Sequence, residues 1–178
     1  MPPQILIRAA DARPLEMQDL LPADTRFKVI IFAGDITDAA QRTKVDKLAE
    51  EMSRPESFLQ KLSPAGKWDT VFDILAVSSG KKETYNYGLL PELFRSHWSK
   101  CVFLITPPAI IDYFDRVLID DIDLMGTQGG KAYASLGVGL SGAVVVVRPD
   151  GYVGFVCPLD ALQDINDYFM AFMKVSRG

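Results

Sequence analysis

The sequence FKVIIFAGD, residues 27–35, decides the fold. Its first part, Phe27–Ala33, is a nearly continuous apolar run, which is typical of a strand buried on both faces of a sheet. Gly34-Asp35 then opens a helix, with Asp35 as the expected N-cap. The apolar positions of this helix follow the spacing i, i+3, i+4, i+7 and are Val45, Leu48, Ala49 and Met52. A buried strand followed by an amphipathic helix indicates the first half of a βαβ unit.

The next segments return the chain to the sheet. A capping box of the form S-x-x-E at Ser53–Glu56 predicts the start of a second, shorter helix, which ends at Ser63–Gly66. Its apolar side is made of Phe58, Leu59 and Leu62. Trp68–Val77 is the next expected strand. Two strands joined by a helical crossover are parallel, and the connection is right-handed.

The C-terminal third predicts an antiparallel hairpin and a last helix. Ala143–Val147 and Tyr152–Val156 have the length and composition of strands, and Arg148–Gly151 has Pro and Gly where a tight turn needs them. Pro158 stands where a helix can start without losing a hydrogen bond. The apolar stripe of that helix consists of Leu159, Leu162, Ile165, Phe169 and Phe172.

The remaining segments are shorter and less regular. Gln4–Arg8 is expected to be an edge strand, and Asp11–Pro14 the turn that follows it. In the middle of the chain we expect loops at Lys81–Tyr87 and Gly126–Gly130, a short helix at Leu93–Lys100, strands at Cys101–Ile105 and Arg116–Asp120, and a helical turn at Lys131–Leu136.

This order of elements predicts an α/β fold with one mixed sheet and helices on both faces, which is the arrangement of thioredoxin. We expect a single domain over residues 1–178. A working thioredoxin carries two cysteines at the N-terminus of its first long helix, where the helix dipole lowers a thiol pKa. The corresponding stretch here, Gly34–Asp38, contains no sulfur. Cys101 and Cys157 lie in or beside apolar runs, where a free cysteine usually behaves as a small buried hydrophobe, so we expect no dithiol site.

Composition and charge exclude several classes of protein. The net charge of -4 argues against a general affinity for nucleic acid. No segment approaches the roughly 20 apolar residues that cross a bilayer, and Arg8 and Asp11 interrupt any signal peptide. The 2 cysteines are too few for a disulfide scaffold. A cytoplasmic, reduced protein is the expectation.

Two glycine-rich stretches imitate nucleotide-binding motifs. Gly137–Gly142 matches G-x-G-x-x-G, but that motif needs a strand before it and a helix N-terminus after it, and here the expected order is reversed. Gly126–Lys131 is one residue short of a phosphate-binding loop, and Ala132 stands where Ser or Thr would hold the metal. We interpret both as turns or loops and expect no cofactor.

Three further features give only weak indications of a metal, catalytic or anion-binding site. Asp120–Asp123 could bind Ca²⁺ or Mg²⁺ through carboxylates but lacks the EF-hand spacing, which favours an exposed turn at a strand end. His97 is the only histidine, and no potential zinc ligands stand at a suitable spacing from it. It could belong to a Ser/His/Asp arrangement, and the alternative is a histidine on a helix surface. We therefore expect no metal. Arg148 could clamp an anion or tether the hairpin by bonding to nearby carbonyls or a carboxylate.

Three stretches, taken in order, resemble one protein family. They are Ala10–Pro14 with Arg26–Gly34, then Asp115–Asp121, and last Val144–Gly154, within which RPDGYVG is the most specific part. Gly130–Tyr133 and Leu136–Val138 fit the same pattern between them. In this order the chain resembles the C-terminal domain of phenol hydroxylases, which are flavoproteins of the phenol 2-monooxygenase type. The resemblance covers nearly the whole chain.

The resemblance implies a thioredoxin-like fold that has lost its redox cysteines and that is associated with dimerisation. In that family FAD and the phenol are held by two preceding domains, so the resemblance implies neither an FAD site nor a catalytic residue here. One departure is Leu124-Met125 after the acidic pair, where the family has aromatic or histidine residues. Met1-Pro2-Pro3 begins almost where the family domain begins, which leaves open a free-standing protein or an excised domain.

Two functions are therefore compared. The first is a redox-inactive module that forms a homodimer or docks onto a flavoprotein or biosynthetic enzyme of aromatic compound metabolism, with no catalytic activity of its own. The second is a cofactor-independent isomerase, cyclase or hydrolase that acts on an aromatic or polyketide-like small molecule. Its candidate acid–base groups, chosen by chemistry alone, are His97, Asp112, Tyr113, Tyr133 and Arg148. This second function needs at least two of these groups to converge on one pocket.

Overall fold

The computed structural model of the chain describes residues 3–95 and 116–174. Within them, seven strands form one sheet in the order β2-β1-β5-β4-β3-β6-β7. The strands are β1 (Ile5–Arg8), β2 (Pro14–Glu16), β3 (Phe27–Gly34), β4 (Phe72–Ser78), β5 (Val117–Ile119), β6 (Ala143–Val147) and β7 (Val153–Cys157). The α-helices are α1 (Ala39–Ser53), α2 (Phe58–Lys61), α3 (Ala132–Leu136) and α4 (Leu162–Met170). Short 3-10 turns are η1 (Met17–Leu20), η2 (Pro64–Gly66), η3 (Trp68–Thr70), η4 (Tyr87–Leu89) and η5 (Glu92–Phe94).

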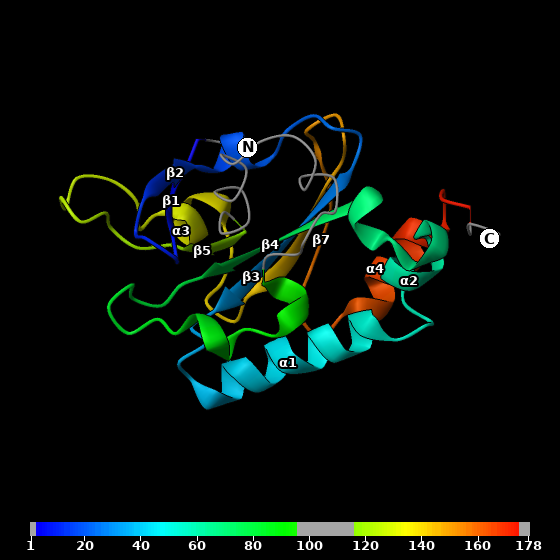
Figure 1. The fold of residues 1–178 in the computed structure, drawn as a ribbon, viewed down its shortest axis with the longest axis horizontal. Helices are drawn as coiled ribbons and strands as arrows, with labels where there is room; N and C mark the ends of the chain where they lie inside the picture. The colour runs from blue at the N-terminus through cyan, green and yellow to red at the C-terminus, as the bar shows by residue number, and fades with distance from the viewer. Residues whose placement is uncertain (1–2, 96–115, 175–178) are drawn as a thin grey trace, which may run out of the picture.

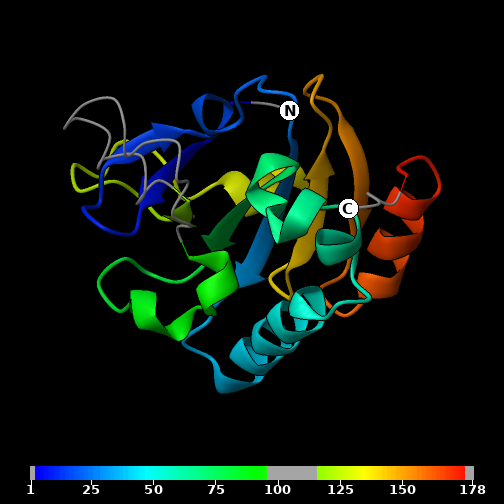
Figure 2. The ribbon, with the colours of Figure 1, turned by 45° about the vertical axis from the view of Figure 1, so that its right-hand side comes forward.

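The centre of the sheet has the predicted thioredoxin arrangement. β3 pairs in parallel with β4 and antiparallel with β6, and β6 pairs antiparallel with β7. The βαβ unit β3-α1-β4 and the hairpin-plus-helix unit β6-β7-α4 therefore meet at β3 (Figure 1). The helices α1, α2 and α4 lie on one side of the sheet, and α3 lies on the other (Figure 2).

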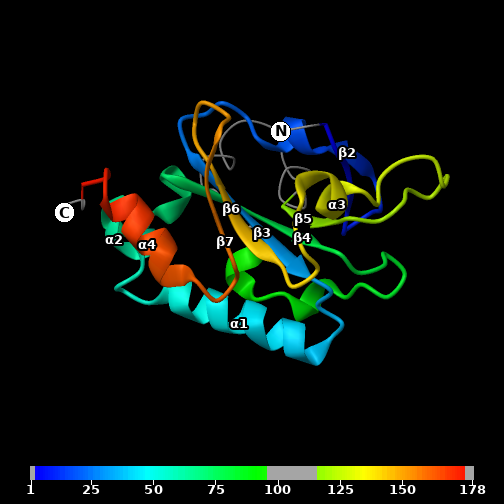
Figure 3. The ribbon, with the colours of Figure 1, turned by 180° about the vertical axis from the view of Figure 1, so that it is seen from behind.

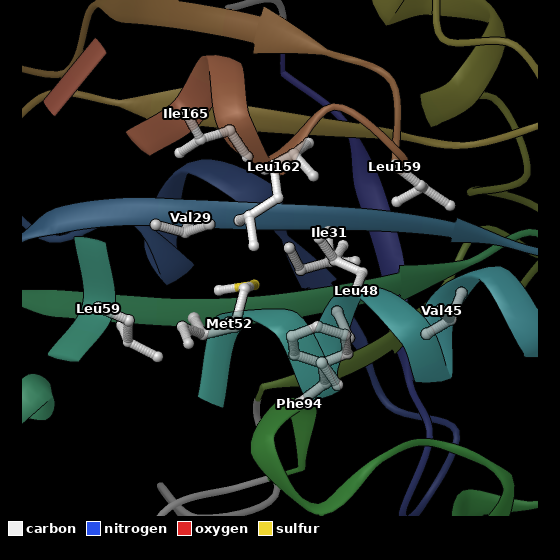
Figure 4. Packing of buried hydrophobic residues seen from close by; sticks show 14 of the residues in the cluster. Val29, Ile31, Val45, Leu48, Met52, Leu59, Phe94, Leu159, Leu162 and Ile165 are labelled. Atoms are coloured by element: carbon white, nitrogen blue, oxygen red, sulfur yellow. The ribbon is translucent and has the colours of Figure 1, made fainter. Parts of the chain in front are cut away.

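A hydrophobic cluster fills the space on each face of the sheet. On the side of α1 and α4, Val29 and Ile31 of β3 meet the helix stripe that the sequence predicts, as Figure 4 shows. On the other side, Ile30 and Phe32 pack against α3 and η1. β3 is thus buried on both faces, as its continuous apolar run predicts, because alternate side chains of a strand point to opposite faces. The four stripe positions Val45, Leu48, Ala49 and Met52 are all buried.

The N-terminal strand differs from its expectation. Gln4–Arg8 was expected to lie at an edge, but β1 pairs with β5 on one side and with the short β2 on the other. The turn after β1 lets the chain fold back at Pro14, so a three-residue strand, β2, occupies the edge. The sequence shows no signal for β2 because three residues are too few to display an alternating pattern.

The starts of α1 and α2 are displaced by three and four residues from their predicted positions. The carboxylate of Asp35 accepts hydrogen bonds from the backbone N–H and the hydroxyl of Thr37, which closes a turn, and Asp38 caps α1 instead. Ser53 is the last residue of α1 rather than the cap of α2, and Ser57 caps α2. Arg54 has extended backbone, because the proline that follows it disfavours a helical conformation at the preceding position.

The C-terminal elements agree with the sequence except at their bounds. β7 begins at Val153, and α4 begins at Leu162, several residues after Pro158. Leu159, Leu162, Ile165 and Phe169 are buried as predicted, whereas Phe172 is exposed because it lies beyond the last residue of α4. β4 begins at Phe72, since Trp68–Thr70 forms a 3-10 turn.

The remaining expectations concern the middle of the chain. Arg116–Asp120 contains β5, and Lys131–Leu136 contains α3. The expected helix Leu93–Lys100 begins in η5, but Arg95 after it has extended backbone. Residues 96–100 of that helix, like the expected strand Cys101–Ile105, lie outside the described residues. Every helix in the described ranges is too short or too polar to cross a membrane.

Candidate functional site

The side chain of Tyr133 hydrogen-bonds to the backbone at the carboxyl ends of both β3 and β4. The backbone N–H of Gly34 donates a hydrogen bond to the Tyr133 hydroxyl at 2.8 Å, and this hydroxyl donates to the carbonyl of Val77 at 2.7 Å. The hydroxyl of Ser78 donates to the carbonyl of Gly34 at 2.9 Å. In a thioredoxin the redox cysteines follow the strand that corresponds to β3. In this chain the side chains of Tyr133 and Ser78 hydrogen-bond to the backbone at that strand end.

Helix α3 positions Tyr133 through a carboxylate at its N-terminus. Asp120, directly after β5, accepts hydrogen bonds from the backbone N–H groups of Ala132 and Tyr133 at 2.9 and 2.8 Å. The Tyr133 ring meets Phe32 edge-to-face, with ring centroids 5.2 Å apart. Burial raises the pKa of the Tyr133 phenol well above its ordinary value, and the nearby Asp120 carboxylate adds to that rise. The phenol is therefore neutral and has both a backbone donor and a backbone acceptor.

Arg148 lies at the opposite end of the sheet. Its guanidinium pairs with the Asp150 carboxylate inside the hairpin turn, which is the tether that the sequence offered as one of two alternatives. Arg148 lines an open hollow of about 430 Å³ with the rings of Phe27, Tyr168 and Phe172 and with the turn residues Pro149 and Asp150. The Phe172 ring lies 5.9 Å from the Phe27 ring and 5.2 Å from the Tyr168 ring, between centroids.

The structure does not bring Tyr133 and Arg148 together. Tyr133 contacts Gly34, the last residue of β3, whereas the hollow beside Arg148 contains Phe27, the first residue of that strand. A strand rises about 3.3 Å per residue, so the two ends of β3 are roughly 23 Å apart. His97, Asp112 and Tyr113 lie outside the described residues. A catalytic role for any of these residues stays a prediction.

The carboxylates of the acidic run after β5, Asp120–Asp123, accept hydrogen bonds from other groups of the protein. Asp120 caps α3, and Asp121 accepts a hydrogen bond from the backbone N–H of Lys82 at 3.0 Å. Asp123 accepts from the backbone and the hydroxyl of Thr127 at 2.7 and 2.9 Å, which lowers the pKa of Asp123. Among the described residues, no group of three or more His, Cys, Asp or Glu side chains is arranged to hold a metal ion.

Both glycine-rich stretches are turns and loops, as the sequence predicts. Gly137 has a left-handed backbone and ends α3, and β6 begins directly after Gly142. No helix N-terminus follows this stretch, so it lacks the feature that holds a pyrophosphate. Gly126–Gly130 belongs to a loop that an isolated bridge between Ile122 and Gly129 closes.

A buried charge network that the sequence analysis missed joins β3 to β4. Asp73 lies opposite Lys28 in the parallel pair, and its carboxylate is 3.2 Å from the Lys28 ammonium. The guanidinium groups of Arg26 and Arg116 lie 3.2 and 3.1 Å from the same carboxylate. Asp24 pairs with both Arg26 and Lys28. Burial raises the pKa of Asp24, but the hydrogen bonds from these two cations outweigh it and lower the pKa to about 2.

The signal for this network was a charge inside an apolar run. Lys28 interrupts the run that forms β3, and Asp73 interrupts the apolar sequence of β4. A charged residue at a strand position that is buried on both faces requires an opposite charge within reach. Sequence spacing alone does not indicate which charge that is.

Comparison with known proteins identifies the family. The family model described as "Phenol hydroxylase, C-terminal dimerisation domain" matches residues 1–177. The chain is 29% identical to the 3-hydroxybenzoate 4-monooxygenase of Comamonas testosteroni over 95% of its own length and 25% of that protein. It is 25% identical to the FAD-dependent monooxygenase terD of Aspergillus terreus over 98% of its own length and 27% of that protein. The chain thus spans about a quarter of the length of these curated relatives.

Solved structures of low sequence identity also align with the chain. One is the thioredoxin domain of a thiol-disulfide oxidoreductase from Bacteroides vulgatus, with a TM-score of 0.49, 10% identity, and coverage of 94% of this chain and 93% of that one. Another is a thioredoxin-like protein from Aeropyrum pernix, with a TM-score of 0.49, 13% identity, and coverage of 95% and 89%. The family match over nearly the whole chain is decisive: the chain belongs to the family of phenol hydroxylase C-terminal dimerisation domains.

Proposed function

We propose that the chain is a redox-inactive assembly module that associates with a second copy of itself. The observation that carries this function is the match of residues 1–177 to a family described as a dimerisation domain. The relatives are monooxygenases in which the matching region is about a quarter of the protein. The alternative is that the chain docks onto a flavoprotein or a biosynthetic enzyme.

The loss of redox chemistry is supported by the segment between β3 and α1. Its two carboxylates serve local structure, since Asp35 closes a turn and Asp38 caps α1. No cysteine stands in this segment. The cysteine that the structure describes, Cys157, is buried at the end of β7. Burial raises the pKa of its thiol to about 11, and the carboxylates of Asp164 and Asp160 add to the rise, so little reactive thiolate is present near neutral pH.

Labelling of Cys157 with a thiol reagent is expected to be slow and strongly pH-dependent. In a Cys101→Ser variant Cys157 is the one remaining thiol. A pKa of about 11, against an ordinary value of 9.0, leaves about 100-fold less thiolate at pH 8. We expect the labelling rate to rise about tenfold per pH unit between pH 7 and 9.5, because thiolate is the nucleophile.

The unfolded state supplies the control for this labelling experiment. In denaturant the same variant should react at the rate of an ordinary thiol, because burial no longer raises the pKa of Cys157. Rapid labelling of the folded variant at pH 7, with a plateau below pH 8, would contradict redox inactivity at this cysteine.

Exposed apolar side chains on the loop after β5 support an interaction role. Leu124 and Met125 are 73% and 83% exposed and lie between the bridged residues Ile122 and Gly129. The loop that contains them projects from the body of the molecule (Figure 1). The loop is braced at its base, where Asp123 bonds to Thr127 and Ile122 bridges to Gly129. Large apolar side chains held out on a braced loop are typical of surfaces that meet another protein.

The second candidate function, a cofactor-independent enzyme, has one observation in its favour. This is the aromatic hollow beside Arg148, which suits a flat apolar ligand. Arg148 is the predicted acid–base residue that lines the hollow among the described residues, and it is already paired with Asp150. The module is therefore the better-supported function.

Light scattering after size-exclusion chromatography tests the proposed function. We expect a species of about 39 kDa, twice the 19.7 kDa of one chain, that gives way to monomer only on dilution. A mass of 19.7 kDa over the whole range from micromolar to several hundred micromolar protein would contradict self-association.

A further inference from the structure

The two edges of the sheet are built differently. β2, at one edge, has three residues and includes Pro14 and Glu16. Short length, proline and charge are the features by which natural proteins prevent an edge strand from pairing with another chain. β7, at the other edge, has five residues, Val153–Cys157, and contains neither a proline nor a charged residue. β7 has one irregularity, the extra residue Gly154 opposite Val146–Val147, but it lacks the short length, the proline and the charge that protect β2.

The face of β7 away from α4 carries exposed apolar side chains. Val153 and Val156 are 45% and 56% exposed, and Tyr152 directly before the strand is 72% exposed. On the face toward α4, Phe155 stacks on the ring of Tyr168, with centroids 5.0 Å apart. The helix thus packs on one face of the strand, and β7 follows the rim of the sheet beside β6 (Figure 3).

β6 satisfies only one side of the β7 backbone. In the described sheet β7 pairs with β6 and with no other strand, so alternate N–H and C=O groups of β7 point away from the sheet. Such a row of unpaired groups beside apolar side chains is a template for a further strand.

We propose that β7 pairs antiparallel with β7 of a second copy of this chain, so that two sheets join into one across a two-fold axis. This inference rests on the proposed function and adds the surface and the partner. An antiparallel pair of identical strands is self-complementary, because the two-fold axis places each donor of one strand opposite an acceptor of the other. The absence of charge in β7 matters because each copy has a net charge of -4, and the seam brings no like charges together.

The flanking side chains enlarge this contact. A five-residue strand is only about 17 Å long, and a stable interface buries about 800 Å² on each partner. Tyr152 stands at the start of β7. The 72% exposed Leu140 lies in the loop before β6, at the end of the sheet where β7 finishes. Both are available to extend the contact beyond the strand pair.

A substitution that introduces a charge into β7 tests the inference. Val156→Lys places a charge on the exposed side of β7 without removing a buried side chain, and the two copies of the charge repel each other near the axis. We expect the dimer dissociation constant, measured by sedimentation, to rise at least tenfold. Glu16→Lys places the same side chain on the β2 edge, and we expect this control to leave the dissociation constant within about twofold. Far-UV circular dichroism and thermal unfolding establish that both variants are folded.

Hydrogen exchange of the wild-type chain gives an independent readout. Amides of Val153–Cys157 should become more protected as protein concentration rises from below to above the dissociation constant, whereas those around Pro14–Glu16 should not change.

The outcomes separate this inference from the proposed function. A wild-type dimer that Val156→Lys leaves intact, with exchange in β7 independent of concentration, overturns the β7 pairing but keeps the assembly function. A wild-type chain that stays monomeric throughout overturns both, and leaves the edge of β7 to a different partner.

Discussion

Replacing Asp73 with alanine is expected to lower the free energy of unfolding by about 3–5 kcal/mol, because it removes one of the two carboxylates that neutralise a buried cluster of cations. The Lys28 side chain is 2% exposed and lies 3.2 Å from the Asp73 carboxylate. Arg26 and Arg116 share that carboxylate, so its loss removes this ion pair from Arg116 and leaves Asp24 to pair with both Lys28 and Arg26. Denaturant unfolding at pH 7 measures the effect.

A matched control and a compensating variant make this result specific. Asp46 is an exposed acidic residue of α1, and Asp46→Ala should change stability by no more than about 0.5 kcal/mol. The double variant Lys28→Met/Asp73→Leu removes both charges from the buried pair and should recover much of the loss, because an apolar pair of similar volume needs no counter-ion. A loss below about 1 kcal/mol in Asp73→Ala would contradict this prediction, since it would show that Asp24 or water satisfies Lys28 without Asp73.

Removing the Tyr133 hydroxyl is expected to cost about 2–4 kcal/mol, although the ring that fills the space is kept. In Tyr133→Phe the N–H of Gly34 loses its acceptor and the carbonyl of Val77 loses a donor, each at a buried position. An unsatisfied buried polar group costs about 1–3 kcal/mol. The variant isolates the hydroxyl because the edge-to-face contact with Phe32 remains.

Tyr152→Phe is the control for this experiment, since the Tyr152 side chain is exposed and its hydroxyl can bond to water. Its stability should stay within about 0.5 kcal/mol of the wild type. If Tyr133→Phe proves equally stable, the tyrosine does not hold the ends of β3 and β4 together, and its conspicuous geometry would favour a catalytic use. A destabilised variant would support a structural role for Tyr133 at the carboxyl ends of β3 and β4.

Several elements could be predicted because their signals are local. The run Phe27–Ala33 indicates a strand buried on both faces, and the structure places β3 at the centre of the sheet with a cluster on each side. The turn Arg148–Gly151 between two apolar runs indicates the hairpin of β6 and β7. Helix starts were predicted less well because Asp35 and Asp38 are both able to cap, and only the bond from Thr37 to Asp35 decides between them.

The candidate site stays a prediction. Of the five acid–base groups chosen by chemistry alone, Tyr133 and Arg148 lie in the described residues, at opposite ends of β3. The sequence marks which residues can exchange protons, but the distance between two such residues depends on how the sheet is ordered.

The amino-acid sequence by itself determined the α/β class of this protein, its parallel βαβ half, its C-terminal hairpin and the absence of a thiol before α1. Tertiary structure alone decided that Tyr133 bonds to Gly34, 99 residues away, and that Asp73, 45 residues from Lys28, pairs with it together with Asp24. It also decided that β2 and β7 form the two edges of the sheet within the described part of the chain. The physical reason is that an apolar pattern reports how deeply a residue is buried, whereas its partners depend on strand order and register, which form only when the whole sheet assembles.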